Sequence, residues 1–184
     1  MRFCVSLLSC FAVIFLAACG QRETLNYAFN INDVSVRTAY QSLDIRFQQQ
    51  LELSPQARTA LEHGVTLAIN LEMELRNDNN MIVEHRDSRS FLLRYLPLSE
   101  RYQLTDEQTG ELKTYSRLRH MLAEMNDFST RMPTGPLPSG SYELRTRVSL
   151  DESRLPTPMQ LPVRFSSQWR HDSEWSVWPF EISV

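Results

Sequence analysis

Hydrophobic and polar residues alternate along much of the chain, and the alternation is most regular over residues 65–75 and 142–150. Side chains of a strand point in turn to its two faces, so each stretch predicts a strand with one buried face. In the first stretch Glu72 and Glu74 are on the polar side, which indicates a solvated face. In the second stretch the polar side carries Glu143, Arg145, Arg147 and Ser149.

Shorter alternating or apolar segments predict further strands. They cover residues 25–31, 43–53, 81–84, 91–96, 102–104, 112–115, 161–165 and 175–184. Turns are expected at 77–80, where the sequence is Asn-Asp-Asn-Asn, and at 105–110. Pro179 lies within the last strand and lacks a backbone N–H, so this strand is expected at the edge of a sheet.

Two short helices interrupt the strands. Ser54 is a typical N-cap, Pro55 fits the first helical position, and Gly64 fits the C-terminal stop. The second helix is predicted to begin at Ser116, with apolar residues at i, i+3, i+4 and i+7: Leu118, Met121, Leu122 and Met125. We expect this stripe to pack on a sheet. A groove for a partner is the alternative.

The order of these elements predicts the fold class. Strands follow one another through short connections without β-α-β alternation, which favours a mainly β fold: an antiparallel β-sandwich or curled sheet with two short helices. An α+β arrangement, with both helices on one face, is the alternative. We expect a single β-rich domain over residues 25–184.

The N-terminus is typical of an exported lipoprotein. Residues 5–18 are almost entirely apolar, follow Arg2, and are too few for a spanning helix, which needs about 20 residues. Leu16, Ala17 and Ala18 precede Cys19, the pattern at which a bacterial lipoprotein is cleaved and its cysteine acylated. We therefore expect a signal peptide over 1–18, lipid on Cys19 and a tether over 19–24. An ordinary leader or an uncleaved anchor are the alternatives.

Lipid on Cys19 would determine where the protein resides. Stable anchoring takes two or more acyl chains, which a lipoprotein cysteine supplies. The next residue is Gly20 rather than the aspartate that favours inner-membrane retention. We expect the protein in the bacterial cell envelope, anchored to the outer membrane and facing the periplasm.

Composition excludes several classes of function. Cys4 and Cys10 would leave with the leader, and lipid would occupy Cys19, so the mature protein would have no thiol for catalysis, zinc binding or a disulfide. The mature chain would carry 18 basic and 22 acidic side chains. This balance argues against a nucleic-acid partner, because such proteins concentrate positive charge.

A search for catalytic or metal sites finds one weak candidate. His171 and Asp172, with Glu174 nearby, form a polar cluster between Trp169 and Trp175. Such a cluster can bind a metal or act as an acid–base pair, but a solvated loop between aromatic anchors is the simpler interpretation. The histidines lack metal-site spacing, and the familiar catalytic motifs are absent from the sequence. We expect no enzyme, no metal and no cofactor. A hydrolase or metal site is the alternative.

Aromatic residues gather near the C-terminus. Trp178 and Phe180 share one face of the last predicted strand, and Ile182 and Val184 continue that face. Packing in the core is the first interpretation. The alternative is an exposed interaction surface, whose candidate residues are Trp169, His171, Trp175 and Trp178.

Several segments together resemble the proteobacterial domain-of-unknown-function family DUF4390. They are 90–95 (Ser-Phe-Leu-Leu-Arg-Tyr), 101–104, 140–151, 155–158 and 173–175, and the resemblance runs over roughly residues 25–182. It implies an exported protein of about this size, often encoded near a sensor kinase and response regulator of the nitrogen-regulation type. It supplies no activity and no catalytic residues. Many members have ordinary leaders or anchors, so the lipoprotein motif is a departure.

These observations lead to two functional hypotheses, beside the alternative of an enzyme built around His171. The first is a non-enzymatic, lipid-anchored periplasmic protein that binds another envelope protein as an interaction, accessory or signalling module. The second is a carrier of a small ligand or lipid. The membrane, reached through the N-terminal lipid, and an envelope protein are the expected partners.

Overall fold

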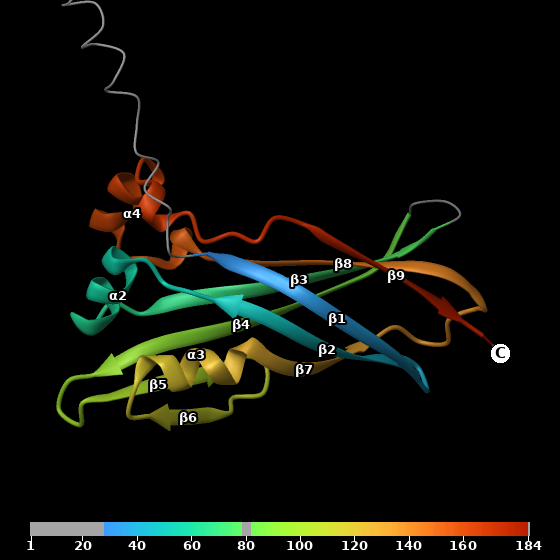
Figure 1. Ribbon diagram of the computed structural model, residues 1–184, viewed down its shortest axis with the longest axis horizontal. Coiled ribbons are helices and arrows are strands. Elements are labelled where there is room, and N and C mark those ends of the chain that lie inside the picture. Colours follow the sequence, from blue (N-terminus) through green and yellow to red (C-terminus); the bar gives the residue numbers. More distant parts are fainter. Residues whose placement is uncertain (1–27, 79–81, 184) are drawn as a thin grey trace, which may run out of the picture.

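The computed structural model describes residues 28–78 and 82–183, which form two antiparallel sheets packed face to face (Figure 1). The smaller sheet has the order β1-β2-β7, with β1 over Phe29–Ala39, β2 over Ser42–Leu51 and β7 over Asp127–Pro133. The mainly β fold expected from the sequence is confirmed. The predicted leader, Cys19 and the tether over 19–24 lie outside the described residues.

The larger sheet has six strands in the order β6-β5-β4-β3-β8-β9. The two most regular alternating segments form its neighbouring central strands, β3 (Leu67–Asn77) and β8 (Gly140–Leu150). The other strands are β4 (Val83–Leu96), β5 (Arg101–Asp106), β6 (Leu112–Tyr115) and β9 (Ser176–Ile182). Pro179 lies in β9 at the edge of the sheet, as expected.

The inward faces of both sheets form the core. On β3 the odd-numbered residues from Leu67 to Leu75 are buried, and Leu71 pairs with Val148 of β8. Opposite them, Leu43, Ile45 and Phe47 of β2 are fully buried. Trp178 and Phe180 of β9 also pack against this core, and Phe180 stacks on Tyr142 with 5.9 Å between ring centroids. These two aromatic side chains therefore lie partly buried against the core.

Both predicted helices are present. Helix α2 (Pro55–Glu62) has Ser54 as its N-cap, and the Ser54 hydroxyl accepts from the Ala57 N–H at 3.1 Å. Gly64, with φ of +89°, adopts the left-handed conformation just after the helix. Helix α3 (Leu118–Asn126) buries Leu118, Met121 and Met125 and contacts β2. Its apolar stripe therefore packs on a sheet, as expected.

The strand predicted over 161–165 is wrong. This segment belongs to helix α4 (Thr157–Arg164), which lies between two short 3-10 helices, η1 (Glu152–Arg154) and η2 (Ser167–Trp169). Of the three alternating residues only Val163 is buried, whereas Leu161 and Phe165 are exposed. Pro158 lies in the first turn, where its fixed φ favours a helix. None of the helices among residues 28–78 and 82–183 is long and apolar enough to span a bilayer.

Strands β1, β4 and β7 differ from the sequence expectation. β1 continues to Ala39, beyond the expected end at residue 31, and residues 25–27 lie outside the described residues. Residues 83–84 and 91–96 belong to one strand, β4, whose middle carries polar side chains on both faces. Strand β7 was not expected, because its inward residues include the polar Thr130. Thr130 accepts a hydrogen bond from Arg89 of β4 at 2.7 Å, so polar groups are paired between the sheets there.

Candidate interaction face

Of the four residues predicted as a possible interaction surface, the structure places one on an outward face. Trp169 and His171 are buried in the core. Trp178 points inward from β9, and its Nε1 donates to the hydroxyl of buried Thr146 at 2.9 Å. Trp175 precedes β9 and lies half-buried against the outward face of the large sheet. The aromatic anchors of this region therefore have different roles.

His171 joins three parts of the fold. Its Nε2 accepts a hydrogen bond from the Ser54 backbone N–H at 2.9 Å, and its ring lies 5.1 Å from that of Phe29, measured between centroids. Its carbonyl accepts from the Leu150 N–H at 2.8 Å. Burial lowers the pKa of His171, against the opposing effect of a backbone hydrogen bond with Trp169. His171 is thus part of the core and not of a solvated loop.

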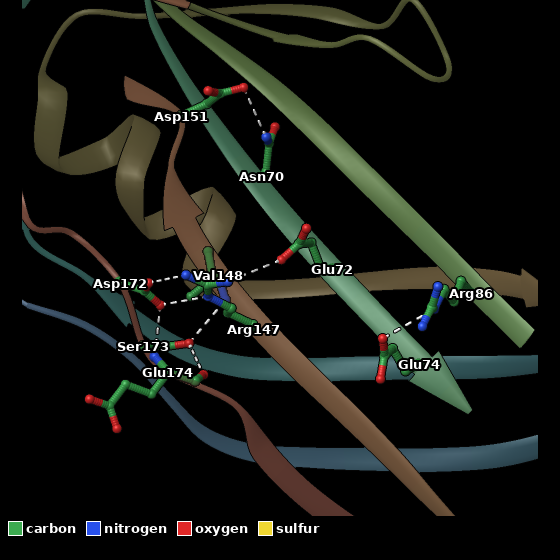
Figure 2. Close-up of polar contacts among 10 residues, drawn as sticks. All are labelled: Asn70, Glu72, Glu74, Arg86, Arg147, Val148, Asp151, Asp172, Ser173 and Glu174. Carbon is green, nitrogen blue, oxygen red and sulfur yellow. Dashed lines mark hydrogen bonds and ion pairs between the residues drawn. The ribbon is translucent and has the colours of Figure 1, made fainter. Parts of the chain in front are cut away.

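Asp172 belongs to a separate polar network, which Glu174 joins through its backbone while its carboxylate points away from the other residues drawn (Figure 2). The Asp172 carboxylate accepts two hydrogen bonds from the Arg147 guanidinium, one of them at 2.9 Å from Nε. Asp172 also accepts from the Glu174 backbone N–H at 2.9 Å. The hydrogen bond from Arg147 is the main cause that lowers the pKa of Asp172. Asp172 is therefore held as an anion by Arg147.

Charged side chains of opposite sign face each other across β3 and β8. In the register, Glu72 pairs with Arg147, Glu74 with Arg145, and Arg76 with Glu143. All of them are on the outward face, because the alternating positions are buried. Arg147 Nη1 lies 3.8 Å from Glu72 Oε2, and Figure 2 shows the two side chains facing each other. Opposite charges that face each other across strands stabilise the pairing and help to fix its register.

The Glu74 carboxylate is more enclosed than that of Glu72. Its side chain is 14% exposed, and its oxygens lie 2.8 Å from Arg76 Nη2 and 3.1 Å from Arg86 Nε. Burial raises the pKa of Glu74, but the hydrogen bond from Arg76 and the nearby charges of Arg86 and Arg145 outweigh it and lower the pKa. The expected solvated face is thus a network of paired charges.

Trp175 extends the ladder towards β9. The guanidinium carbon of Arg145 lies 5.2 Å from the centroid of the Trp175 ring, a cation–π contact. Val177, opposite Arg145 in the β8–β9 register, is 46% exposed. An aromatic ring, an arginine and an exposed aliphatic side chain therefore adjoin one another at this edge of the sheet.

Two grooves flank the Arg147–Glu72 pair. One has a volume of about 560 Å³, and its lining includes Glu72, Glu74, Arg86, Ser88 and Trp175. The other has about 590 Å³, and its lining includes Asn70, Arg147, Asp151, Arg170, Asp172 and Glu174. We call the outward surface between and around them the charged face, defined by Glu72, Glu74, Arg86, Arg145, Arg147, Asp172, Trp175 and Val177.

The sequence contained part of the signal for this face. The alternation placed Arg145 and Arg147 on the polar side of their strand, as it did Glu72 and Glu74. The pairing of these arginines with the glutamates could not be predicted, because it depends on β3 and β8 being neighbours in this register. Among the described residues, no group of three or more histidine, cysteine, aspartate or glutamate side chains is arranged to hold a metal ion.

Comparison with protein families gives one match. The model of DUF4390, a domain of unknown function, matches residues 27–179, which include every described strand except the last residues of β9. Comparison with curated proteins and with solved structures gives no significant match. Because the match covers most of the chain, this protein belongs to the DUF4390 family.

Proposed function

We propose that this protein is a non-enzymatic, lipid-anchored module of the bacterial envelope that binds another envelope protein through the charged face. The observation that carries the proposal is the grouping of Trp175, Arg145 and Val177 on the outward side of the large sheet. Tryptophan and arginine are the residue types that most often dominate binding energy in protein interfaces.

The charges favour a particular kind of partner. Arg145 and Arg147 alternate with Glu72 and Glu74 across the strands, so neither sign dominates the charged face. A strongly basic or acidic polymer gains little from such a surface. A protein surface with a matching mixture of charges can exchange ion pairs with it, which favours specificity over raw affinity.

Lipid on Cys19 would supply the membrane attachment. The motif formed by Leu16, Ala17, Ala18 and Cys19 supports the lipid, and Gly20 supports the outer membrane, with the domain facing the periplasm. Two or more acyl chains would hold the domain at the bilayer without a spanning helix. A tethered module then meets its partner at the membrane surface, where both are concentrated.

A carrier of a small ligand is the second candidate, supported by a cleft of about 350 Å³ between β5, β6, α3 and β7. Apolar side chains line part of it, including Phe91, Leu104 and Phe128. The volume is at the small end of ligand pockets. Lys113 lies 2.8 Å from Glu124 and 3.4 Å from Glu111 among the lining residues, so a ligand would have to fit beside these ion pairs. The charged face is therefore the stronger candidate.

Fractionation of cells tests the anchor. We expect the wild-type protein to sediment with membranes. The Cys19→Ala variant has no cysteine to acylate, so a high-salt wash should release it from the membranes. Mass spectrometry of the mature N-terminus identifies the acyl groups directly. A variant that stays on membranes after a high-salt wash, together with an unmodified Cys19 in the wild type, would contradict the lipid anchor.

Crosslinking in living cells tests the docking surface. The natively lipidated protein is crosslinked and purified, and its adducts are identified by mass spectrometry. We expect one stoichiometric protein adduct, which is lost in the double variant Trp175→Ala, Arg145→Gln. The matched control is Tyr40→Ala, since Tyr40 is 89% exposed in the β1–β2 turn. A protein adduct that persists in the double variant would show that the charged face is not the docking surface. A small molecule or lipid that co-purifies when no protein adduct forms would favour the carrier.

A further inference from the structure

Helix α4 has two apolar sides. Met159 and Val163 pack against the core. On another side, exposed apolar residues occur at i, i+3, i+4 and i+7: Pro158, Leu161, Pro162 and Phe165, the last just after the helix. Leu161 is 69% exposed and Phe165 is 87% exposed. We call these four residues the α4 stripe.

The segment that carries the α4 stripe contains basic residues and no acidic residue. Residues 155–170 contain Arg164 and Arg170, both exposed, and no carboxylate, in a chain whose net charge is −3. Arg164 lies in the last turn of α4, beside the stripe, whereas Arg170 lines the groove with Asp172 and Glu174. An apolar stripe bordered by basic residues is typical of helices that lie in a membrane interface. Anionic headgroups attract such arginines over roughly a Debye length.

The α4 stripe is near the point where the described chain begins. Phe29, the first residue of β1, contacts the ring of His171, and η2, just before His171, packs against both α2 and α4. Figure 1 shows α4 and the start of β1 at one end of the molecule and the β1–β2 turn at the other. Cys19 precedes Ala28 by nine positions, which can span at most about 30 Å. A lipid on Cys19 would therefore keep α4 close to the bilayer.

We propose that the α4 stripe lies on the surface of the anionic membrane in which the Cys19 lipid is embedded. This inference rests on the lipid anchor of the proposed function. The contact would add a second attachment point, so that the domain is oriented on the membrane as well as tethered to it. Because the strands run from the α4 end towards the β1–β2 turn, the charged face would stay accessible from the side.

The test places a probe in the α4 stripe of the natively lipidated protein. Phe165→Cys supplies a thiol for the fluorophore NBD, and the exposure of Phe165 makes this substitution compatible with the fold. The labelled protein is reconstituted into vesicles of phosphatidylethanolamine and phosphatidylglycerol with or without doxyl-labelled lipid. Tyr40→Cys, labelled in the same way, is the matched control at the far end of the molecule.

We expect blue-shifted NBD emission at position 165, with a loss of about half or more in the presence of doxyl lipid, because interfacial helices bury their apolar face about 5–10 Å into the boundary. Position 40 should show neither change. Solvent-like emission at both positions would overturn the membrane contact. A blue shift at position 165 without doxyl quenching would also overturn it, because a protein rather than lipid would then cover the α4 stripe. Flotation with the vesicles reports the lipid anchor separately, so failure of the anchor is distinguishable from failure of the α4 contact.

Discussion

The imidazole Nε2 of His171 accepts a hydrogen bond from the backbone N–H of Ser54 at 2.9 Å, across 117 positions of sequence. Ser54 is also the N-cap of α2, so one buried contact connects the start of this helix to the segment that leads into β9. The Nε2 atom can accept only while it carries no proton. The fold therefore requires the neutral imidazole at this position.

Stability is expected to fall as the pH drops below about 6.5. Burial lowers the pKa of His171 in the folded state, so the unfolded state binds the proton more readily between the folded value and the ordinary 6.5. We expect the free energy of unfolding to be lower at pH 5.5 than at pH 7, because the unfolded state takes up more of the proton over this range. Urea unfolding at both pH values measures it.

His171→Gln tests the assignment of this pH dependence. Its amide can also accept a hydrogen bond but does not titrate, so the slope between pH 7 and 5.5 should flatten. His63→Gln is the control, because it removes an exposed imidazole at the end of α2 by the same substitution. A slope that is equal in all three proteins would contradict the role of His171.

Trp178 and Thr146 are expected to be energetically coupled. Trp178 Nε1 donates to the Thr146 hydroxyl at 2.9 Å, and Thr146 is fully buried. Trp178→Phe leaves this hydroxyl without its indole donor and should lower the free energy of unfolding by about 1–3 kcal/mol. Thr146→Val added to Trp178→Phe should cost less than the sum of the two single changes. Strict additivity in this double-mutant cycle would show that the hydrogen bond is not formed in solution.

Glu107 is expected to titrate far below an ordinary glutamate. Hydrogen bonds from Arg154, at 2.8 Å from Nη2, and from Ser90 lower the pKa of Glu107 to about 2. The ionised Glu107–Arg154 pair therefore stabilises the folded state above pH 4.5, and this contribution is lost as the pH falls towards 2. NMR titration should place the midpoint near 2 in the wild type and near the ordinary value in Arg154→Gln. Both side chains are partly exposed, so the free energy of unfolding at pH 7 should change by less than about 1 kcal/mol. A wild-type midpoint near 4 would contradict the ion pair.

The elements that the sequence predicted well are those whose pattern has one cause. In β3 and β8, alternation comes directly from one buried face and one polar face. In α2, the N-cap Ser54, Pro55 and Gly64 each act through local backbone geometry. Such signals need no knowledge of neighbouring strands.

The prediction of secondary structure failed in segments whose conformation depends on tertiary contacts. In β4, Asp87 and Arg89 are on the inward side, and Arg89 is half-buried between Thr130 and Asp106, 3.5 Å from the latter. No alternation marks such a strand. In α4, the exposed Leu161 and Phe165 imitate a strand pattern, although they continue a helical spacing from Pro158.

The candidate site could likewise be predicted only in part. The sequence placed charged residues on one side of each long strand, which the structure bears out. It could not show that Arg147 meets both Glu72 and Asp172, because this needs the register of β3 with β8 and the path of the chain before β9. Trp169 and Trp175, six positions apart, differ in burial for the same reason.

The most direct test of the proposed docking surface is site-specific photo-crosslinking in living cells. A photoreactive amino acid replaces Val177 on the charged face, and Ser35 on the exposed outward side of β1 serves as the control position. We expect one protein adduct from position 177 of the membrane-bound protein and none from position 35. Adducts of equal yield from both positions, or none from position 177, would contradict an envelope module that binds its partner through the charged face.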